Sequence, residues 1–171
     1  MQWNKIYNDD TLKILKSLPD NCIDMIWGDP DYNVGINYNG KKYTQKWNDY
    51  IDWYCELAKE SFRVLKNSGN LFLMNYPKQN AYLRVKCLDD LAFDVQDYVW
   101  IYNTNVGHSK RRLTTAHRSI IHATKSKNNN ITTLIPNKIQ NVFFELSFEI
   151  ILDRGISTKT DICIETNASI P

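Results

Sequence analysis

The stretch Ile23-Asp24-Met25-Ile26-Trp27-Gly28-Asp29-Pro30-Asp31-Tyr32 decides the fold of this chain. Residues 23–27 are mostly apolar and favour a short β-strand, and Gly28 with Pro30 requires a loop directly after it. Ligands of open α/β sheets bind beyond the carboxyl ends of the strands. The sequence therefore predicts a binding site built from the loop at 29–32.

The groups in this loop suit a planar amine. The carboxylate of Asp29 and the carbonyl of Pro30 are able to accept both hydrogens of an exocyclic amino group, which localises a nitrogen lone pair otherwise delocalised into the ring. The ring of Tyr32 supplies a stacking surface. Taken alone, the same tetrapeptide is more simply an ordinary turn, because Asp and Pro both favour turns.

Helices and strands alternate around the loop. Apolar spacing predicts helices at residues 11–18, 49–66 and 78–88. Asp9 or Asp10 is expected to cap the first helix and Pro19 to end it, and Asn67-Ser68-Gly69 to end the second. Strands are predicted at residues 3–7, 23–27, 71–74, 95–102 and 117–124. This order predicts an α/β sheet of parallel strands, with the last two forming an antiparallel pair at one edge.

Length, cysteine spacing and histidine spacing exclude several classes of protein. The 171 residues suit one domain, and no apolar run approaches the roughly 20 residues of a membrane helix. The amino terminus lacks the pattern of a signal peptide, and the four cysteines are spaced singly, which predicts reduced thiols and a cytoplasmic location. His117 and His122 are expected to face opposite sides of a strand, so no metal site is predicted.

Positive charge is concentrated in one segment. No acidic residue lies between Asp97 and Glu145, whereas seven of the 21 basic residues do, which leaves 21 − 7 = 14 basic against 19 acidic side chains elsewhere. The seven are Lys110, Arg111, Arg112, Arg118, Lys125, Lys127 and Lys138. Such a segment is typical of polyanion binding, and equally of a solvated surface loop.

A series of motifs follows in a fixed order along roughly residues 3–128. They are Ile6-Tyr7-Asn8-Asp9-Asp10, Asp29-Pro30-Asp31-Tyr32-Asn33, Trp47-Asn48-Asp49-Tyr50, Asn70-Leu71-Phe72-Leu73-Met74-Asn75, Gly107-His108-Ser109-Lys110-Arg111-Arg112 and Ala123-Thr124-Lys125-Ser126-Lys127-Asn128. In this order they resemble the β group of amino-methylating DNA methyltransferases, whose catalytic half precedes the cofactor half. The resemblance implies a Rossmann-like, S-adenosylmethionine-dependent methyltransferase fold, with residues 1–128 as its catalytic part.

The resemblance also implies roles for individual residues. Asp29, the Pro30 carbonyl and Tyr32 would hold the target amino group and stack on a base flipped out of double-stranded DNA. Asp10 and Asp29 would contact the methyl donor, S-adenosylmethionine, and the alternative role of Asp10 is the helix N-cap. The DNA contacts would come from His108, Ser109, Lys110, Arg111, Arg112 and Arg118.

The implied reaction is methyl transfer to an exocyclic amino group of DNA. In the family, Asp at the first position of the tetrapeptide goes more often with adenine N6, and Ser with cytosine N4. Adenine N6 is therefore the expected target, in a restriction–modification system of a bacterium, archaeon or phage. The open alternatives are a remnant that binds DNA without catalysis, a cytosine-N4 or RNA methyltransferase, and a methyltransferase acting on protein glutamine.

The chain departs from the family pattern in two places. Asp31 stands where the family has a second Pro, and this places a negative charge beside the pocket. Beyond Asn128 the chain has one glycine, Gly155, and no Gly-x-Gly for the loop that wraps the donor. We therefore expect a fold incomplete on its carboxyl-terminal, cofactor side and an atypical tail at 129–171 from truncation or a frame shift. A homodimer or a complementing chain is the candidate protein partner.

Overall fold

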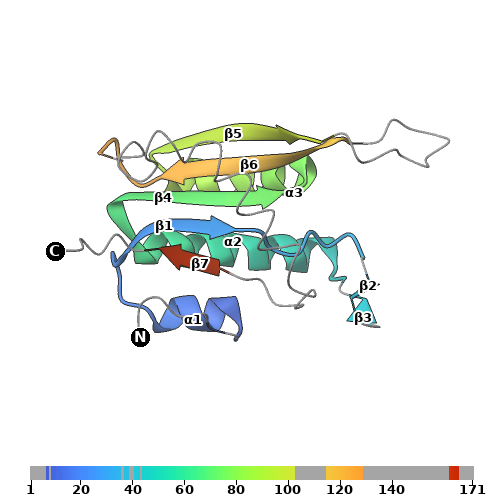
Figure 1. Ribbon diagram of the computed structural model, residues 1–171, viewed down its shortest axis with the longest axis horizontal. Helices are drawn as coiled ribbons and strands as arrows, with labels where there is room; N and C mark the ends of the chain where they lie inside the picture. The colour runs from blue at the N-terminus through green and yellow to red at the C-terminus, as the bar shows by residue number, and fades with distance from the viewer. Residues whose placement is uncertain are drawn as a thin grey trace.

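The main element of the structure is a five-stranded sheet (Figure 1). The computed structural model describes residues 7, 9–35, 37–38, 41–42, 44–102, 115–128 and 162–165. The sheet order is β5 (Asp94–Ile101), β6 (His117–Thr124), β4 (Leu65–Asn75), β1 (Ile23–Gly28) and β7 (Ile162–Glu165). β1 and β4 are parallel, β6 is antiparallel to both of its neighbours, and β7 is antiparallel to β1. Two further short strands, β2 (Asn37–Tyr38) and β3 (Lys41–Lys42), pair with each other.

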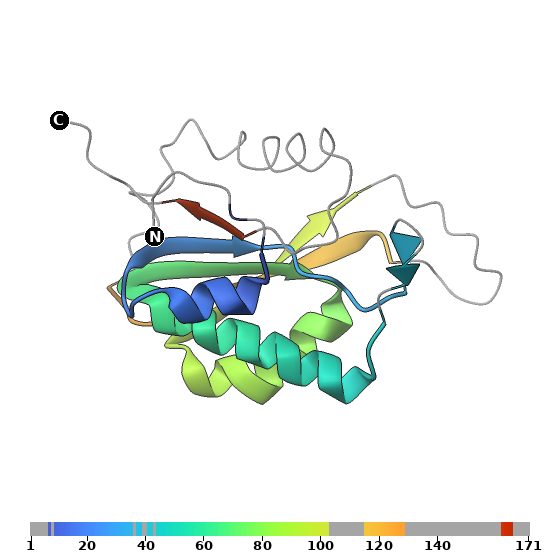
Figure 2. The same cartoon turned by 90° about the horizontal axis from the view of Figure 1, so that it is seen from below.

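The described helices lie together on one face of the sheet (Figure 2). Along the chain they are α1 (Thr11–Ser17), α2 (Trp47–Val64), α3 (Pro77–Leu83), a π-helical turn (Arg84–Leu88) and α4 (Asp89–Leu91). The predicted apolar stripe of α2 forms the centre of the core, where Ile51, Tyr54 and Ala58 are fully buried together with Leu71 and Leu73 of β4. Removing this apolar surface from water is the main force that fixes α2 to the sheet.

The predicted α/β architecture is confirmed, and the sheet is mixed rather than largely parallel. The expected antiparallel pair at the sheet edge is β5 and β6. However, β6 also pairs with β4, so it lies between β4 and β5, two strands that run in the same direction. The crossover through α3 therefore places β5 one strand position away from β4, and β6 fills the position between them.

The boundary between α2 and β4 differs from the prediction. The helix ends at Val64, and β4 begins directly at Leu65, so Asn67-Ser68-Gly69 lies inside the strand. The pairing shifts between Ile23↔Leu65 and Met25↔Asn70. Over this stretch β4 advances five residues while β1 advances two, so the extra residues of β4 form a bulge. A Cβ at Gly69 would lie 3.0 Å from the carbonyl oxygens of Asp24 and Lys66. The glycine is thus needed for this bulge and not for a helix end.

The other predicted helices are confirmed with small shifts. Asp10 caps α1, where its carboxylate accepts a hydrogen bond of 2.9 Å from the backbone N–H of Lys13. The segment predicted at 78–88 begins one residue earlier, with Pro77 in the first turn, and continues through the π-helical turn to Leu91. None of the described helices is long and apolar enough to cross a membrane.

Part of the sequence prediction falls on residues that the structure does not describe. The strand predicted at 3–7 lies outside the described residues except for Tyr7, and so does the basic loop at 103–114. Of the tail at 129–171, only the backbone of β7 is described.

Candidate active site

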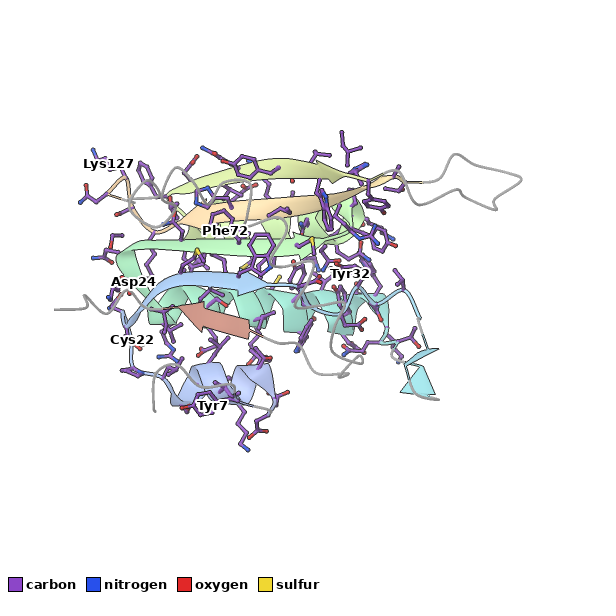
Figure 3. All side chains as sticks on the ribbon, viewed as in Figure 1. Tyr7, Cys22, Asp24, Tyr32, Phe72 and Lys127 are labelled. Carbon is purple, nitrogen blue, oxygen red and sulfur yellow. The ribbon has the colours of Figure 1, made fainter. Side chains whose placement is uncertain are left out.

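The loop at 29–32 leaves the sheet at the carboxyl end of β1, as the sequence predicts. Gly28 makes this exit possible, because a Cβ there would lie 2.7 Å from Cδ2 of Leu73 on the neighbouring strand. Asp29 is half-buried and Pro30 is buried. Figure 3 shows Tyr32 at this end of the sheet, with Cys22 and Asp24 at the opposite end.

Side chains from α2, β4 and α3 hold the backbone of the loop. The hydroxyl of Tyr50 donates to the carbonyl of Asp31 over 2.7 Å, and Asn75 donates to that hydroxyl over 2.9 Å. Gln79 donates to the carbonyl of Tyr32 over 2.7 Å. Within the described part of the chain, no hydrogen bond reaches the carbonyl of Pro30. This oxygen therefore stays available to a ligand while its neighbours are occupied.

Two hydrogen bonds between Asn33 and Gln45 hold the chain directly after Tyr32. Asn33 adopts a left-handed backbone conformation with φ of 55°, which Asn tolerates better than most residues. Its side chain accepts from the backbone N–H of Gln45 over 2.7 Å and donates to the carbonyl of the same residue over 3.1 Å. Asp31, which replaces the second Pro of the family pattern, has an exposed side chain. The turn is thus held by hydrogen bonds at the place where a second Pro would have stiffened it.

Asp29 and Tyr32 are hydrogen-bonded to each other. The hydroxyl of Tyr32 donates to Oδ1 of Asp29. Burial raises the pKa of Asp29 above its usual range, while the Tyr32 hydrogen bond and the charge of Arg118 act in the opposite direction. Burial, followed by the charge of Asp29, also raises the pKa of Tyr32, so its hydroxyl stays protonated as a donor. A carboxylate has about four acceptor positions, so Asp29 keeps capacity for a further donor.

Arg118 lies at this end of the sheet among three tyrosines. The centre of its guanidinium is 4.0 Å from the ring centroid of Tyr76, 5.1 Å from that of Tyr102 and 5.3 Å from that of Tyr32. Tyr32 and Tyr76 meet edge to face, with centroids 5.3 Å apart. The sequence motifs place Arg118 with the DNA contacts and do not single out Tyr76 or Tyr102. Both tyrosines directly follow the ends of β4 and β5, which is the signal that would have found them.

Asn75 is the last residue of β4 and directly precedes Tyr76. It is fully buried, and its Oδ1 accepts from the backbone N–H of Tyr76 over 2.8 Å while its amide supports Tyr50. The side chain therefore caps the end of β4 and at the same time supports the loop at 29–32.

The remaining site residues predicted from the sequence lie in three different situations. The carboxylate of Asp10 is exposed and caps α1, whose first turn points toward the end of β1 in both views (Figures 1 and 2). His108, Ser109, Lys110, Arg111 and Arg112 lie outside the described residues. His122 is buried and bonded through Nε2 to Asn70 over 2.8 Å. Among the described residues, no group of His, Cys, Asp and Glu side chains is arranged to hold a metal ion.

The sequence matches a family model described as DNA methylase, of the N6/N4 type, over residues 23–152. The chain belongs to the N6/N4 DNA methylase family. The type II methyltransferase M.BamHI of Bacillus amyloliquefaciens is 41% identical over 80 residues, which make up 46% of this chain and 19% of that protein. The DNA adenine methyltransferase YhdJ of Escherichia coli K12 is 30% identical over 125 residues, which make up 72% of this chain and 42% of that protein. This member of the DNA methylase family thus spans less than half the length of these curated relatives.

Solved structures confirm the methyltransferase fold of this family member. The cytosine-N4-specific PvuII DNA methyltransferase matches with a TM-score of 0.56 at 19% identity, over 76% of this chain and 52% of the other. A DNA modification methylase from Thermus thermophilus, complexed with S-adenosyl-L-methionine, matches with a TM-score of 0.53 at 18% identity, over 86% of this chain and 63% of the other. The fold expected from the sequence motifs is therefore confirmed.

Proposed function

We propose that this chain carries the base-binding and catalytic part of a methyltransferase that modifies adenine N6 in DNA. The observation that carries the proposal is the convergence of Asp29, the unbonded carbonyl of Pro30 and the ring of Tyr32 at the carboxyl end of β1. Membership of the family and the name of the Escherichia coli relative, a DNA adenine methyltransferase, support this choice of base.

The loop acts on the amino group of the target base. Asp29 and the Pro30 carbonyl each accept one amino hydrogen, so that the nitrogen lone pair points away from the ring and becomes nucleophilic. The nitrogen loses one proton as its bond to the methyl carbon forms, and the Asp29 carboxylate is its first acceptor. Burial raises the pKa of Asp29, which makes this carboxylate a better base than an exposed one.

Tyr32 supplies the face on which the base stacks. Its hydroxyl is tied to Asp29 and its ring edge to Tyr76, which fixes the ring plane before the base arrives. The base has to leave the duplex to reach this site, because its amino group is paired and stacked inside the helix. The partner is therefore double-stranded DNA with one flipped base, and the basic segment at 108–112 contacts the phosphates beside it.

S-adenosylmethionine, when bound, supplies the methyl group from its sulfonium. Two carboxylates at the same end of the sheet fit this donor: the exposed Asp10, the N-cap of α1, which suits the adenine and ribose polar groups, and Asp29 beside the reacting centre. Residues 129–171 hold no Gly-x-Gly. We assign the glycine-rich donor loop to a segment outside residues 1–171, in the same polypeptide, a second copy or a complementing chain. The setting is a restriction–modification system in a prokaryotic or phage-infected cytoplasm.

The test is transfer of tritium from S-adenosyl-[methyl-³H]methionine to unmethylated genomic DNA, followed by chromatography of the nucleosides. We expect label in N6-methyladenine, and a loss of at least about a hundredfold in Asp29→Ala, because the variant removes the acceptor that acts on the reacting nitrogen. Label found only in N4-methylcytosine would mean that the target base is cytosine and not adenine. A folded chain that binds both DNA and S-adenosylmethionine and transfers no label would refute the proposal in favour of a non-catalytic remnant.

Asp24→Asn is the matched control for Asp29→Ala. Asp24 lies on the same strand at the opposite end of the sheet, where it pairs with Lys66 over 2.9 Å (Figure 3). Its replacement should leave the rate of label transfer unchanged. Calorimetric titration of the chain with S-adenosylmethionine, with and without DNA, measures donor binding independently of the reaction.

A further inference from the structure

One guanidinium is surrounded by tyrosines from three separate segments. Tyr32 comes from the loop after β1, Tyr76 follows β4, and Tyr102 follows β5, while Arg118 stands near the start of the antiparallel strand β6. Because β6 begins where the other three strands end, this topology brings all four side chains to the same end of the sheet.

The contacts of Arg118 leave its charge without an ion pair. Among the described residues, its guanidinium donates to the hydroxyl of Tyr102 and, over 3.4 Å, to the carbonyl of His117. The six ion pairs among the described residues all lie elsewhere. Cation–π contact with tyrosine faces holds the group in place without neutralising it. The positive charge is therefore free to act on the nearby Asp29.

Asp29 meets few other charges. Tyr32 donates to it from its own loop, and Tyr50 and Tyr54 of α2 and Asn75 of β4 are neutral. Asp31 is exposed, and Arg118 of β6 is the one described cation whose charge favours the ionised form of Asp29. Removing this cation would leave the burial of Asp29 opposed by the Tyr32 hydrogen bond alone.

We propose that Arg118 is a positioning residue of the methyl-transfer site: it clamps Tyr32 against Tyr76 and thereby holds the Tyr32 hydroxyl on the carboxylate of Asp29, which accepts the amino hydrogens. This inference deepens the proposed function and rests on it. It assigns Arg118 to the geometry and charge of the Asp29–Tyr32 pair and replaces the phosphate contact expected from the sequence.

The experiment is a pH titration of the chain labelled with ¹³Cγ-aspartate and followed by NMR, with the Asp29 signal assigned from Asp29→Asn. In Arg118→Met the titration midpoint of Asp29 should move to higher pH, because the favourable charge is gone. Arg118→Lys should return most of the shift, since it restores the charge. Arg63→Met, which removes an arginine at the other end of the sheet, is the matched control and should leave the Asp29 midpoint unchanged.

An Asp29 midpoint in Arg118→Met equal to that of the wild type would overturn the inference. If the salt dependence of duplex binding then also falls by about one unit of slope, Arg118 belongs to the phosphate contacts. If Arg118→Met does not fold, Tyr102→Phe removes the hydroxyl that fixes the guanidinium, and it should move the midpoint in the same direction.

The titration uses neither DNA nor a methyl donor. A chain that shows the shift, binds S-adenosylmethionine and transfers no methyl group would disprove the proposed function while leaving the electrostatic role of Arg118 in place. If the Arg118→Met variant transfers methyl groups at the wild-type rate, the positioning role is disproved and the proposed function is unaffected. The two failures are thus distinguishable.

Discussion

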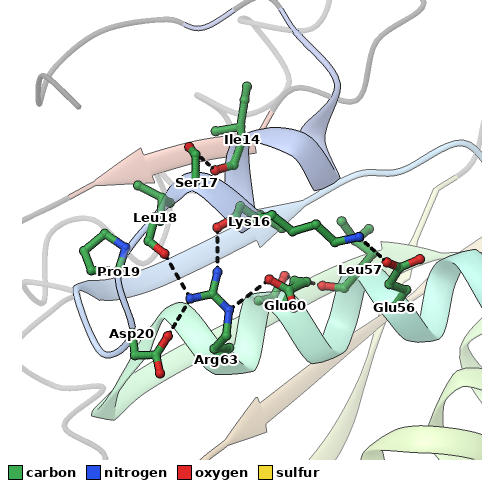
Figure 4. Close-up of polar contacts among 12 residues, drawn as sticks. Ile14, Lys16, Ser17, Leu18, Pro19, Asp20, Glu56, Leu57, Glu60 and Arg63 are labelled. Carbon is green, nitrogen blue, oxygen red and sulfur yellow. Dashed lines mark hydrogen bonds and ion pairs between the residues drawn. The ribbon is translucent and has the colours of Figure 1, made fainter.

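An arginine lies at each end of the sheet, and the two differ in the partners of their guanidinium groups. Arg63, at the end of α2, donates to the carboxylates of Asp20 and Glu60 over 2.5 and 2.9 Å and to the carbonyls of Leu15 and Leu18 over 2.8 and 2.9 Å (Figure 4). Arg118, at the carboxyl ends of the strands, faces three aromatic rings, and within the described residues no carboxylate bonds to it.

This difference separates an arginine that stabilises the fold from one that serves a site. The guanidinium of Arg63 satisfies the last carbonyls of α1 and joins that helix to α2, so its hydrogen-bonding capacity is used within the fold. Within the part of the chain that the structure describes, Arg118 has no ion pair, and its hydrogen bonds go to Tyr102 and His117. The comparison predicts that replacing Arg63 lowers the free energy of unfolding more than replacing Arg118 does, and that the chemistry of Asp29 depends on Arg118.

The largest loss of stability is expected for a buried asparagine at the carboxyl end of the sheet. Asn80 is buried beneath it, accepts from Tyr54 over 2.8 Å and donates to both oxygens of Ser119 over 2.9 Å. Asn80→Ala removes the acceptor of the Tyr54 hydroxyl and a donor from both oxygens of Ser119, whose hydroxyl keeps its bond to Asp97. The variant should lower the free energy of unfolding by roughly 3 kcal/mol in urea denaturation. Asn48→Ala, at an exposed position in α2, should change it by less than about 0.5 kcal/mol.

The second prediction concerns the structural arginine. Arg63→Met removes the side-chain donor from the carbonyl of Leu18 and one of the two donors to the carbonyl of Leu15, which still accepts from the backbone N–H of Leu18. The variant should cost about 2 kcal/mol, mostly from those bonds, because its ion pairs with Asp20 and Glu60 are partly exposed and screened by water. Urea denaturation measures the loss. Arg84→Met, which removes one exposed ion pair with Asp89, should cost less than about 1 kcal/mol. Equal losses in the two variants would mean that Arg63 is an ordinary surface residue.

A smaller effect is expected from the arginine of the site. Arg118→Met should lower the free energy of unfolding by about 1 kcal/mol, because methionine keeps the apolar contact with the rings and the variant loses only the cation–π contacts and the hydrogen bonds to Tyr102 and His117. A loss as large as that of Arg63→Met would remove the distinction between the two arginines. Thermal and urea unfolding of both variants under the same conditions give the comparison directly.

The smallest effect is a pH-dependent gain. Because burial raises the pKa of Asp29 in the folded chain above its unfolded value, the stability linked to this group is present at low pH and is lost as the pH rises through the folded pKa. Asp29→Asn should therefore be slightly more stable than the wild type at pH 8 and equal to it near pH 3. Its amide oxygen still accepts from Tyr32. A variant less stable than the wild type at pH 8 would contradict the cited burial effect.

The sequence predicts the parts of the site that are local in the chain. Residues 23–32 combine an apolar strand with a glycine and a proline, so both the strand and the position of the loop follow from ten neighbouring residues. The cap of α1 by Asp10 is equally local. Short-range patterns of this kind reflect backbone and hydrogen-bonding preferences that act within a few residues.

The rest depends on contacts between distant segments. The position of β6 between β4 and β5, and the bulge at Gly69, are set by pairing between strands and leave no periodic signal in the sequence. The setting of Arg118 was missed for the same reason, because Tyr32 and Tyr76 reach it from other strands. The position of Arg118 in a basic segment predicts a DNA contact, and that contact stays a prediction.

The insertion of β6 also has a consequence for the order in which the molecule is made. β4 and β5 leave the ribosome before β6, and the two strands are parallel to each other in the finished sheet. They do not pair with each other there, because β6 lies between them. The nascent sheet is therefore open in its middle, and synthesis must reach Thr124 before the two halves join. Because non-local pairing of this kind is slow, the chain passes through a stage with unpaired strand edges, and Arg118 arrives with the strand that closes them.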